Sequence, residues 1–283
     1  QQLWSLVKRD VLNQLRNPMI IRVKAMQNIV QGLLFGLIFL QLGYDQQGLG
    51  SREGCIIFFV VALIFTTIQG VISNVPRERA IFYHERDSNI YSVSSYLLSK
   101  FLTDLPGELF FNFLFSVISY WLVGLNPGVG QFFIFCLFLI LNAFAAICIG
   151  YWIAVLSPNE TIALIITPFC CIFQVLFSGT FLNLDDVPDW GIWIPYWSVT
   201  RWTFQALIVN EFDGATFHCS PSDTTCTTSG KDVIDKYNFG DTPMYGCGLI
   251  IFGIGLGFAF LAYLTLALKI GYVVVRKKKT KSS

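Results

Sequence analysis

Six long apolar stretches determine what this 283-residue chain can fold into. Each is at least as long as the roughly 20 apolar residues with which an α-helix crosses the hydrocarbon core of a bilayer. Charged residues make up only 13% of the chain, against about 25% in soluble domains. So little charge excludes a water-soluble globular fold of this size. We therefore predict an all-α integral membrane protein with six transmembrane helices, at residues 19–43, 55–75, 97–123, 130–156, 160–182 and 248–275.

The segment before the first span, residues 1–17, is amphipathic. Leu3, Val7, Val11 and Leu15 recur every four residues and so line one face of a helix, while its charges lie elsewhere. The segment is too short and too charged to cross a bilayer. It is expected to lie flat at the membrane interface, although an ordinary amphipathic helix of a soluble protein has the same pattern.

The distribution of lysine and arginine predicts the orientation. Fourteen of them fall on one side, in the amino-terminal segment, in the 76–100 loop and in the carboxy-terminal tail, whereas four fall on the other side. Cytoplasmic loops carry the excess of positive charge in membrane proteins, so both termini are expected in the cytoplasm. Residues 183–247 then form a large extracellular loop, rich in tryptophan, part of which is expected to re-enter the membrane.

The eight cysteines divide into two groups. Cys219, Cys226 and Cys247 fall on the outer side, where disulfides persist. Three pairings are possible; Cys219 with Cys226 is preferred because it closes a short polar loop, which leaves Cys247 free or paired between chains. The others lie in apolar spans and are expected to be buried thiols: Cys55, Cys136, Cys148, Cys170 and Cys171. No metal site is expected.

Catalytic motifs are missing from the sequence. It contains no G-x-x-x-x-G-K-[ST] phosphate loop, no H-E-x-x-H and no G-x-S-x-G, so no catalytic residue is predicted. Asp104 and Glu108 are the acidic residues of the third span, and are expected to pair with Lys100 or a neighbouring helix end. A membrane protein without its own ion-coupling carboxylates or motor is expected to use the motor of another domain.

The cytoplasmic segment 76–96 is the candidate contact for such a motor. It surrounds a short apolar core with charges of both signs, as a docking element does, although an ordinary solvated loop has a similar composition. The candidate coupling residues are Arg77, Glu78, Arg79, Phe82, His84, Glu85, Arg86 and Asp87.

Four segments resemble the membrane domain of G-subfamily, or White-type, ABC transporters. PRERAIFYHER and SVSSYLLSKFLTDLP are similar to the stretch between its second and third helices. LVKRDVLNQLRNP resembles its amino-terminal connecting helix, and FSGTFLNLDDVPDWGIWIPYWSVTRWTFQALIVNEF resembles the end of its fifth helix and the start of its outer loop. The segments occur in the family's order and extend over nearly the whole chain.

The resemblance implies the transmembrane half of an ATP-driven exporter that moves lipids, sterols or amphipathic small molecules by alternating access. It implies a nucleotide-binding domain before Gln1, holding ATP and Mg²⁺, so that the full-length protein would be an ATP-hydrolysing translocase. It also implies a second transporter half, identical or different, and a location in the plasma membrane among membrane lipids. No nucleic-acid partner is expected.

The resemblance also assigns roles to residues. In this family a coupling helix, here 77–87, touches the motor, and the second and fifth spans line the substrate cavity. Thr66 stands where some drug exporters carry an aromatic clamp, which argues against flat polycyclic drugs, and Thr180 stands where they carry a leucine of a hydrophobic plug. The cavity and plug positions are Phe65, Thr66, Ile172, Val175, Thr180 and Phe181. Plain packing is the alternative role for each.

A different class of function is the alternative: a motor-free channel, scramblase or assembly subunit. It predicts that the gene encodes no phosphate-loop domain upstream of Gln1.

Overall fold

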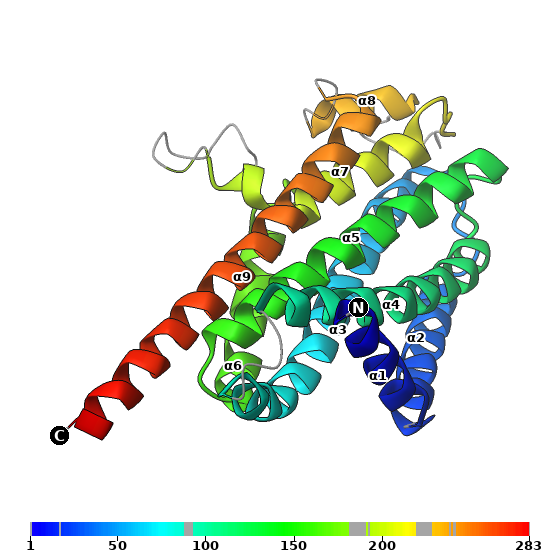
Figure 1. Ribbon diagram of the computed structural model, residues 1–283. Helices are drawn as coiled ribbons and strands as arrows, with labels where there is room; N and C mark the ends of the chain where they lie inside the picture. The colour runs from blue at the N-terminus through cyan, green and yellow to red at the C-terminus, as the bar shows by residue number, and fades with distance from the viewer. Residues whose placement is uncertain are drawn as a thin grey trace.

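The computed structural model describes residues 2–16, 18–87, 93–180, 191, 193–218, 228–237, 239 and 242–282. Helices make up nearly all of this part, and no strand occurs in it beyond two isolated β-bridges. Figure 1 shows the long helices side by side with α9 on one flank. The helices are α1 Gln2–Arg16, α2 Pro18–Ile38, α3 Gln46–Asp87, α4 Val93–Val123, α5 Val129–Leu156, α6 Glu160–Leu176, the short 3-10 helix η3 Pro195–Trp197, α7 Val199–Phe212, α8 Gly230–Lys236 and α9 Met244–Ser282.

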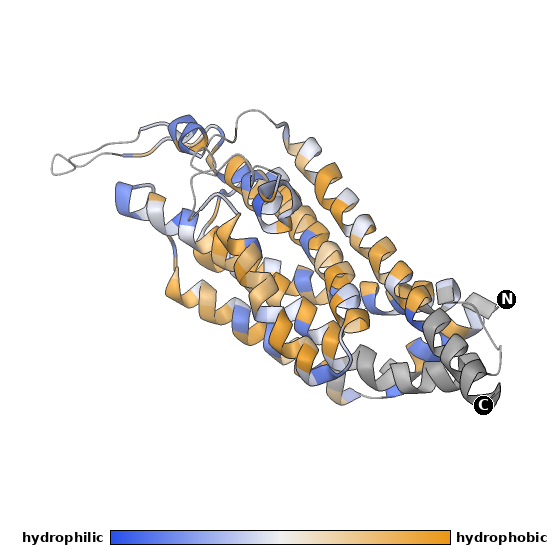
Figure 2. Cartoon of the chain, turned by 90° about the vertical axis from the view of Figure 1, so that its left-hand side faces the viewer, coloured by the Kyte–Doolittle hydropathy of each residue, from blue (hydrophilic) through white to orange (hydrophobic). Residues whose placement is uncertain are grey.

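Four helices are long and apolar enough to cross a membrane. Their apolar parts are Gln46–Ser73, Leu97–Val123, Val129–Leu156 and Met244–Lys269, which coincide with the second, third, fourth and sixth predicted spans. Figure 2 shows these helices as mainly hydrophobic along their length. The prediction of an all-α membrane protein is confirmed.

The remaining two predicted spans differ from this pattern. α2 carries Arg22 and Lys24 in its second turn, and its hydropathy is lowered by them. α6 is apolar but has 17 residues, a length of about 26 Å against a hydrocarbon core of about 30 Å. Six crossings therefore stay a prediction.

Helix α5 forms the centre of the bundle and packs against α3, α4, α7 and α9. The rings of Phe59 on α3, Phe115 on α4 and Phe135 on α5 meet there, with the Phe59 ring centroid 5.4 Å from Phe115 and 6.2 Å from Phe135. Burial of large rings in edge-on contact stabilises this crossing beyond the area that they bury.

Three helix boundaries differ from the predicted ones. Residues 46–54, expected as an outer connection, already belong to α3, because Asp45 caps it: the N–H of Gly48 donates to its Oδ1 at 3.0 Å. α2 ends at Ile38, earlier than residue 43, and Gln41 turns the chain with a positive φ of 50°. α6 ends at Leu176, earlier than residue 182.

Helix α1 packs against α4 with a face that differs from its apolar stripe. Leu6 and Asp10 are buried, and the Asp10 carboxylate lies 3.1 Å from the Lys100 ammonium of α4. Val11, on the predicted apolar face, is exposed and so is free to contact lipid. Lys100 thus forms an ion pair with Asp10 of α1.

A glycine permits the close approach of α3 and α5. A Cβ added at Gly150 would lie 3.1 Å from the Cβ of Val71 and 3.4 Å from the Cα of Ile68. We predict that Gly150→Leu lowers the free energy of unfolding by about 1–3 kcal/mol through overpacking. Gly253→Leu is the matched control, because nothing lies within 4 Å of a Cβ there. Thermal unfolding in detergent measures both; equal melting temperatures would contradict the close packing.

Candidate functional site

The predicted cavity residues of α3 occupy its middle turns. Phe65 is half-buried and packs against the core. The Thr66 hydroxyl donates to the carbonyl of Ala62 at 2.9 Å and lies 3.2 Å from that of Leu63. Its one O–H donor is therefore used within α3, and Thr66 offers a polar ligand only the acceptor side of its hydroxyl.

The predicted cavity residues of α6 lie on a helix that packs beside α3. Ile172 is 57% exposed, and Val175 is half-buried. The exposed side chains near Ile172 are also large and apolar: Ile165, Phe169, Phe173 and Leu176. The structure thus brings α3 and α6 together, and α6 presents an uncovered apolar surface of the kind that marks a protein, ligand or lipid contact.

The predicted plug follows the end of α6. Gly179, three residues after α6 ends, has a φ of +88°, a conformation that favours glycine and turns the chain there. The Ser178 hydroxyl donates to the Val175 carbonyl at 2.7 Å and lies 3.0 Å from the Thr180 hydroxyl. Thr180 therefore belongs to a small polar turn. Phe181 lies outside the described residues.

The predicted coupling residues lie at the end of α3, whose backbone continues as one helix through Asp87. Their side chains lie outside the part of the chain that the structure describes, as do Cys219 and Cys226. The five membrane cysteines are free thiols, and all are buried except Cys170, which is half-buried. Cys247 is also free and fully buried, which favours a free thiol over a pairing between chains.

The acidic residues of the third span pair with side chains of neighbouring helices. The Lys24 ammonium of α2 donates to Oε1 of Glu108 at 2.5 Å, and the Tyr151 hydroxyl of α5 donates to Asp104. Each contact joins α4 to a neighbour, so these carboxylates act as links within the bundle.

Two neutral polar side chains join helices deep in the bundle. Nδ2 of Asn142 on α5 donates to the Val60 carbonyl of α3 at 3.3 Å. The N–H of Val199 donates to Oε1 of Gln174 at 2.9 Å, which ties the first turn of α7 to α6. Helix-to-helix hydrogen bonds of this kind hold membrane bundles in register.

An ion pair that sequence patterns missed lies at the outer end of the bundle. Arg52 of α3 is 1% exposed and donates to Glu211 of α7. Its other nitrogen donates to the carbonyls of Leu42 at 2.5 Å and Gly124 at 3.0 Å. Glu211 also accepts from the N–H of Asn126 at 3.0 Å. One charged pair therefore ties the α2–α3 and α4–α5 connections to helices α3 and α7.

The environment of Glu211 is electrostatically mixed. Burial raises the pKa of this carboxyl above its ordinary value, while the Asn126 N–H and the Arg52 guanidinium act in the opposite direction. No spacing in the sequence reveals the pair, because 159 positions separate its members. The available signal is weak: each residue is a charge at the edge of an apolar segment, with another charge close by in the sequence, Glu53 beside Arg52 and Asp213 near Glu211.

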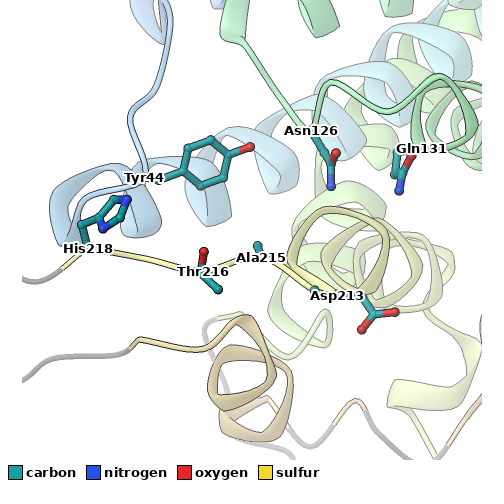
Figure 3. Close-up of a pocket in the computed structure, with 8 residues that line it drawn as sticks. Tyr44, Asn126, Gln131, Asp213, Ala215, Thr216 and His218 are labelled. Atoms are coloured by element: carbon teal, nitrogen blue, oxygen red, sulfur yellow. The ribbon is translucent and has the colours of Figure 1, made fainter.

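A pocket of about 660 Å³ lies beside this pair, where the same connections meet (Figure 3). The N–H of His218 donates to the Tyr44 carbonyl at 2.9 Å, and the Arg52 guanidinium lies 4.3 Å from the Tyr44 ring centroid. Its lining is mostly polar: Tyr44, Asn126, Gln131, Asp213, Gly214, Ala215, Thr216 and His218. No group of three metal-ligating side chains occurs among the residues described.

The apolar helices, the polar links inside them and the exposed face of α6 define a helical membrane domain. The sequence matches the ABC-2 type transporter family over residues 1–212. It is 31% identical to ABC transporter G family member 1 of Dictyostelium discoideum over 95% of this chain, and 32% identical to Protein white of Drosophila melanogaster, also over 95%. It is 35% identical to the Broad substrate specificity ATP-binding cassette transporter ABCG2 of Sus scrofa over 76%.

The chain belongs to the ABC-2 type transporter family, as a membrane domain related to the ABC G family. The resemblance inferred from its motifs is therefore confirmed. The chain spans 35%, 39% and 33% of the length of these three relatives.

Proposed function

We propose that this chain is the transmembrane half of an ATP-driven exporter that moves lipids, sterols or amphipathic small molecules by alternating access. The observation that carries the proposal is its membership of a family whose relatives include a protein named as an ATP-binding cassette transporter. ATP and Mg²⁺ would bind to a nucleotide-binding domain, and a second transporter half, identical or different, would complete the cavity.

The length of α3 supports a mechanical coupling to that domain. Its apolar part ends at Ser73, and the helix continues to Asp87, which is about 21 Å further at the α-helical rise. A continuous helix transmits a displacement of its end along its axis. Residues Arg77–Asp87 are thus suited to receive the movement of a motor and to pass it to the α3–α5 contact.

The surface of α6 supports the substrate class. The exposed side chains around Ile172 are apolar, and the hydroxyl of Thr66 is bound within its own helix. A cavity built from such surfaces favours apolar or amphipathic cargo, since it offers no fixed charge. The polar pocket beside Tyr44 would then be the side of release, because polar lining holds apolar cargo weakly.

The test uses the full-length protein in lipid vesicles. We expect its ATPase rate to rise when a sterol, phospholipid or amphipathic drug that it exports is added, and we expect transport to require ATP. Cargo movement that continues at the same rate without ATP would identify a motor-free channel or scramblase. Lack of stimulation by every member of these three classes would contradict the proposed substrate class.

The orientation has its own prediction, based on two glycosylation sequons. Asn159 is exposed and followed by Glu160 and Thr161, yet the proposed topology places it in the cytoplasm, where it is expected to stay unmodified. Asp223→Asn creates a second sequon, in the outer loop, which is expected to gain a glycan. Gel mobility before and after glycosidase treatment in eukaryotic cells reads out both. A glycan on Asn159 would show that this residue faces the outer side and would contradict the proposed topology.

A further inference from the structure

Helix α7 begins inside the bundle and runs toward its outer end. At its start the Ser198 hydroxyl donates to the Gln174 carbonyl of α6 at 2.9 Å. Near its end Nδ2 of Asn210 donates to the Gln131 carbonyl in the first turn of α5, at 3.0 Å. Arg201 precedes Asn210 by nine residues, so it lies about 14 Å from Asn210 along the axis of α7, toward the inside of the bundle.

The depth of this region follows independently from α9. Nζ of Lys269 donates to the Val155 and Leu156 carbonyls at 2.7 Å each, which marks the inner end of the bundle. The ring of Trp197 lies 6.5 Å from Phe258, and Phe258 is about 16 Å from Lys269 along α9. In a hydrocarbon core of about 30 Å, Trp197 lies near the middle and Arg201 in the outer half.

Arg201 is a cation without an acidic partner among the ion pairs of the described residues. Its guanidinium carbon lies 4.9 Å from the Tyr196 ring centroid and 4.9 Å from that of Trp202. Its Nε is buried and has no hydrogen-bond partner within the described part of the chain. A charge in the membrane is costly unless it is neutralised, and so marks a candidate binding site.

The surface around Arg201 is aromatic and uncovered. Trp193, Tyr196 and Trp197 are 62%, 53% and 52% exposed. The indole N–H of Trp202 donates to the Tyr196 carbonyl at 3.0 Å, which fixes η3 against α7. Figure 1 shows η3 beside α9, on the flank of the bundle. Tryptophan and tyrosine are enriched where apolar chains meet polar headgroups.

We propose that Arg201, with the aromatic surface of Trp193, Tyr196 and Trp197, binds the phosphate headgroup of one membrane phospholipid. The guanidinium offers phosphate oxygens a forked set of N–H donors. The positive end of the α7 dipole adds to the attraction, since Ser198 caps that end of the helix. The acyl chains lie along Trp197 and the adjoining face of α9.

A membrane lipid fits this site better than a soluble anion. The exposed aromatic rings lie on the flank of the bundle at membrane depth, where lipid acyl chains surround the protein. The site is distinct from the α3–α6 surface, and its lipid is a bound structural ligand, whichever cargo the protein exports. Only the assignment of the lipid to the outer leaflet rests on the proposed topology.

The test measures phospholipids that stay bound to the full-length protein after detergent extraction, by native mass spectrometry with added phosphatidylcholine. Arg201→Gln is expected to weaken retention of one lipid per chain by about tenfold, as for loss of a charge-assisted hydrogen-bonded pair, and Arg201→Lys by less. Arg22→Gln is the matched control, because Arg22 is an exposed arginine on α2. Diacylglycerol, which lacks phosphate, is not expected to be retained.

The proposal would be overturned if Arg201→Gln retained as much phospholipid as the unaltered protein. It would also be overturned if inorganic phosphate displaced the lipid, because the site would then bind soluble anions. If Arg201→Gln does not fold, Trp193→Leu replaces it, since it keeps the cation and removes an exposed ring; unchanged retention there counts against the site. Substrate-stimulated ATPase of the same preparations separates failure of this site from failure of the exporter proposal.

Discussion

Replacing Arg52 by methionine is expected to destabilise the folded protein by about 3–5 kcal/mol, the usual result of leaving one partner of a buried ion pair alone. Glu211 would stay buried with a single N–H donor, from Asn126. The carbonyls of Leu42 and Gly124 would also lose their donor. The melting temperature in detergent measures the effect, and the yield of folded protein should fall with it.

Two comparisons isolate the cause. Lys236→Met removes a pair with Glu53 in which the lysine side chain is 60% exposed, and is expected to cost less than about 1 kcal/mol. Arg52→Met combined with Glu211→Met removes both charges and should recover part of the loss, because no buried charge is left unpaired. If the double variant is no more stable than Arg52→Met, the ion pair does not explain the loss.

The amino-acid pattern predicted the parts of the fold that depend on local composition. α3, α4, α5 and α9 contain apolar runs long enough to cross a bilayer, and hydropathy alone locates them. Their ends were less accurate, because caps such as Asp45 and turns such as Gln41 depend on a few hydrogen bonds. These bonds leave little trace in a pattern of apolar residues.

Contacts between distant segments escaped prediction for a different reason. Arg52 lies between the first two predicted spans, where the charge distribution predicts an outer connection, whereas the structure buries it within α3 against Glu211. Likewise the 183–247 segment is predicted as a large outer loop with a part that re-enters the membrane, but no pattern identifies α7 as that part or predicts that 12 of its 14 residues are buried. Both features require knowing which helices are adjacent, and adjacency is not encoded in the period of one helix.

The candidate cavity was placed by resemblance to a family. α3 and α6 do pack together, which is necessary for Phe65, Thr66, Ile172 and Val175 to line one cavity. Within this chain, however, Thr66 bonds to its own helix and Ile172 is exposed, so these side chains do not by themselves enclose a cavity. The roles of these residues therefore stay predictions about the assembled transporter.

Replacing Phe82 by aspartate is expected to reduce ATP-dependent transport by the full-length protein about tenfold or more, by removing an apolar anchor of the size that dominates docking surfaces. Phe82 lies nine residues beyond Ser73 on the same helix, so a charge there is outside the apolar part of α3 and should leave the melting temperature unchanged. Substrate stimulation of the ATPase should be lost, while the basal rate persists.

Phe82→Leu is the matched control, because leucine keeps an apolar side chain at the same position; it is expected to retain most of the transport. The comparison tests the function of α3 as a lever, since a helix that is continuous from Gln46 to Asp87 can carry motion only if its far end is held. A folded Phe82→Asp protein that transports normally would show that the motor acts elsewhere. Loss of transport with a lowered melting temperature would instead assign Phe82 to stability.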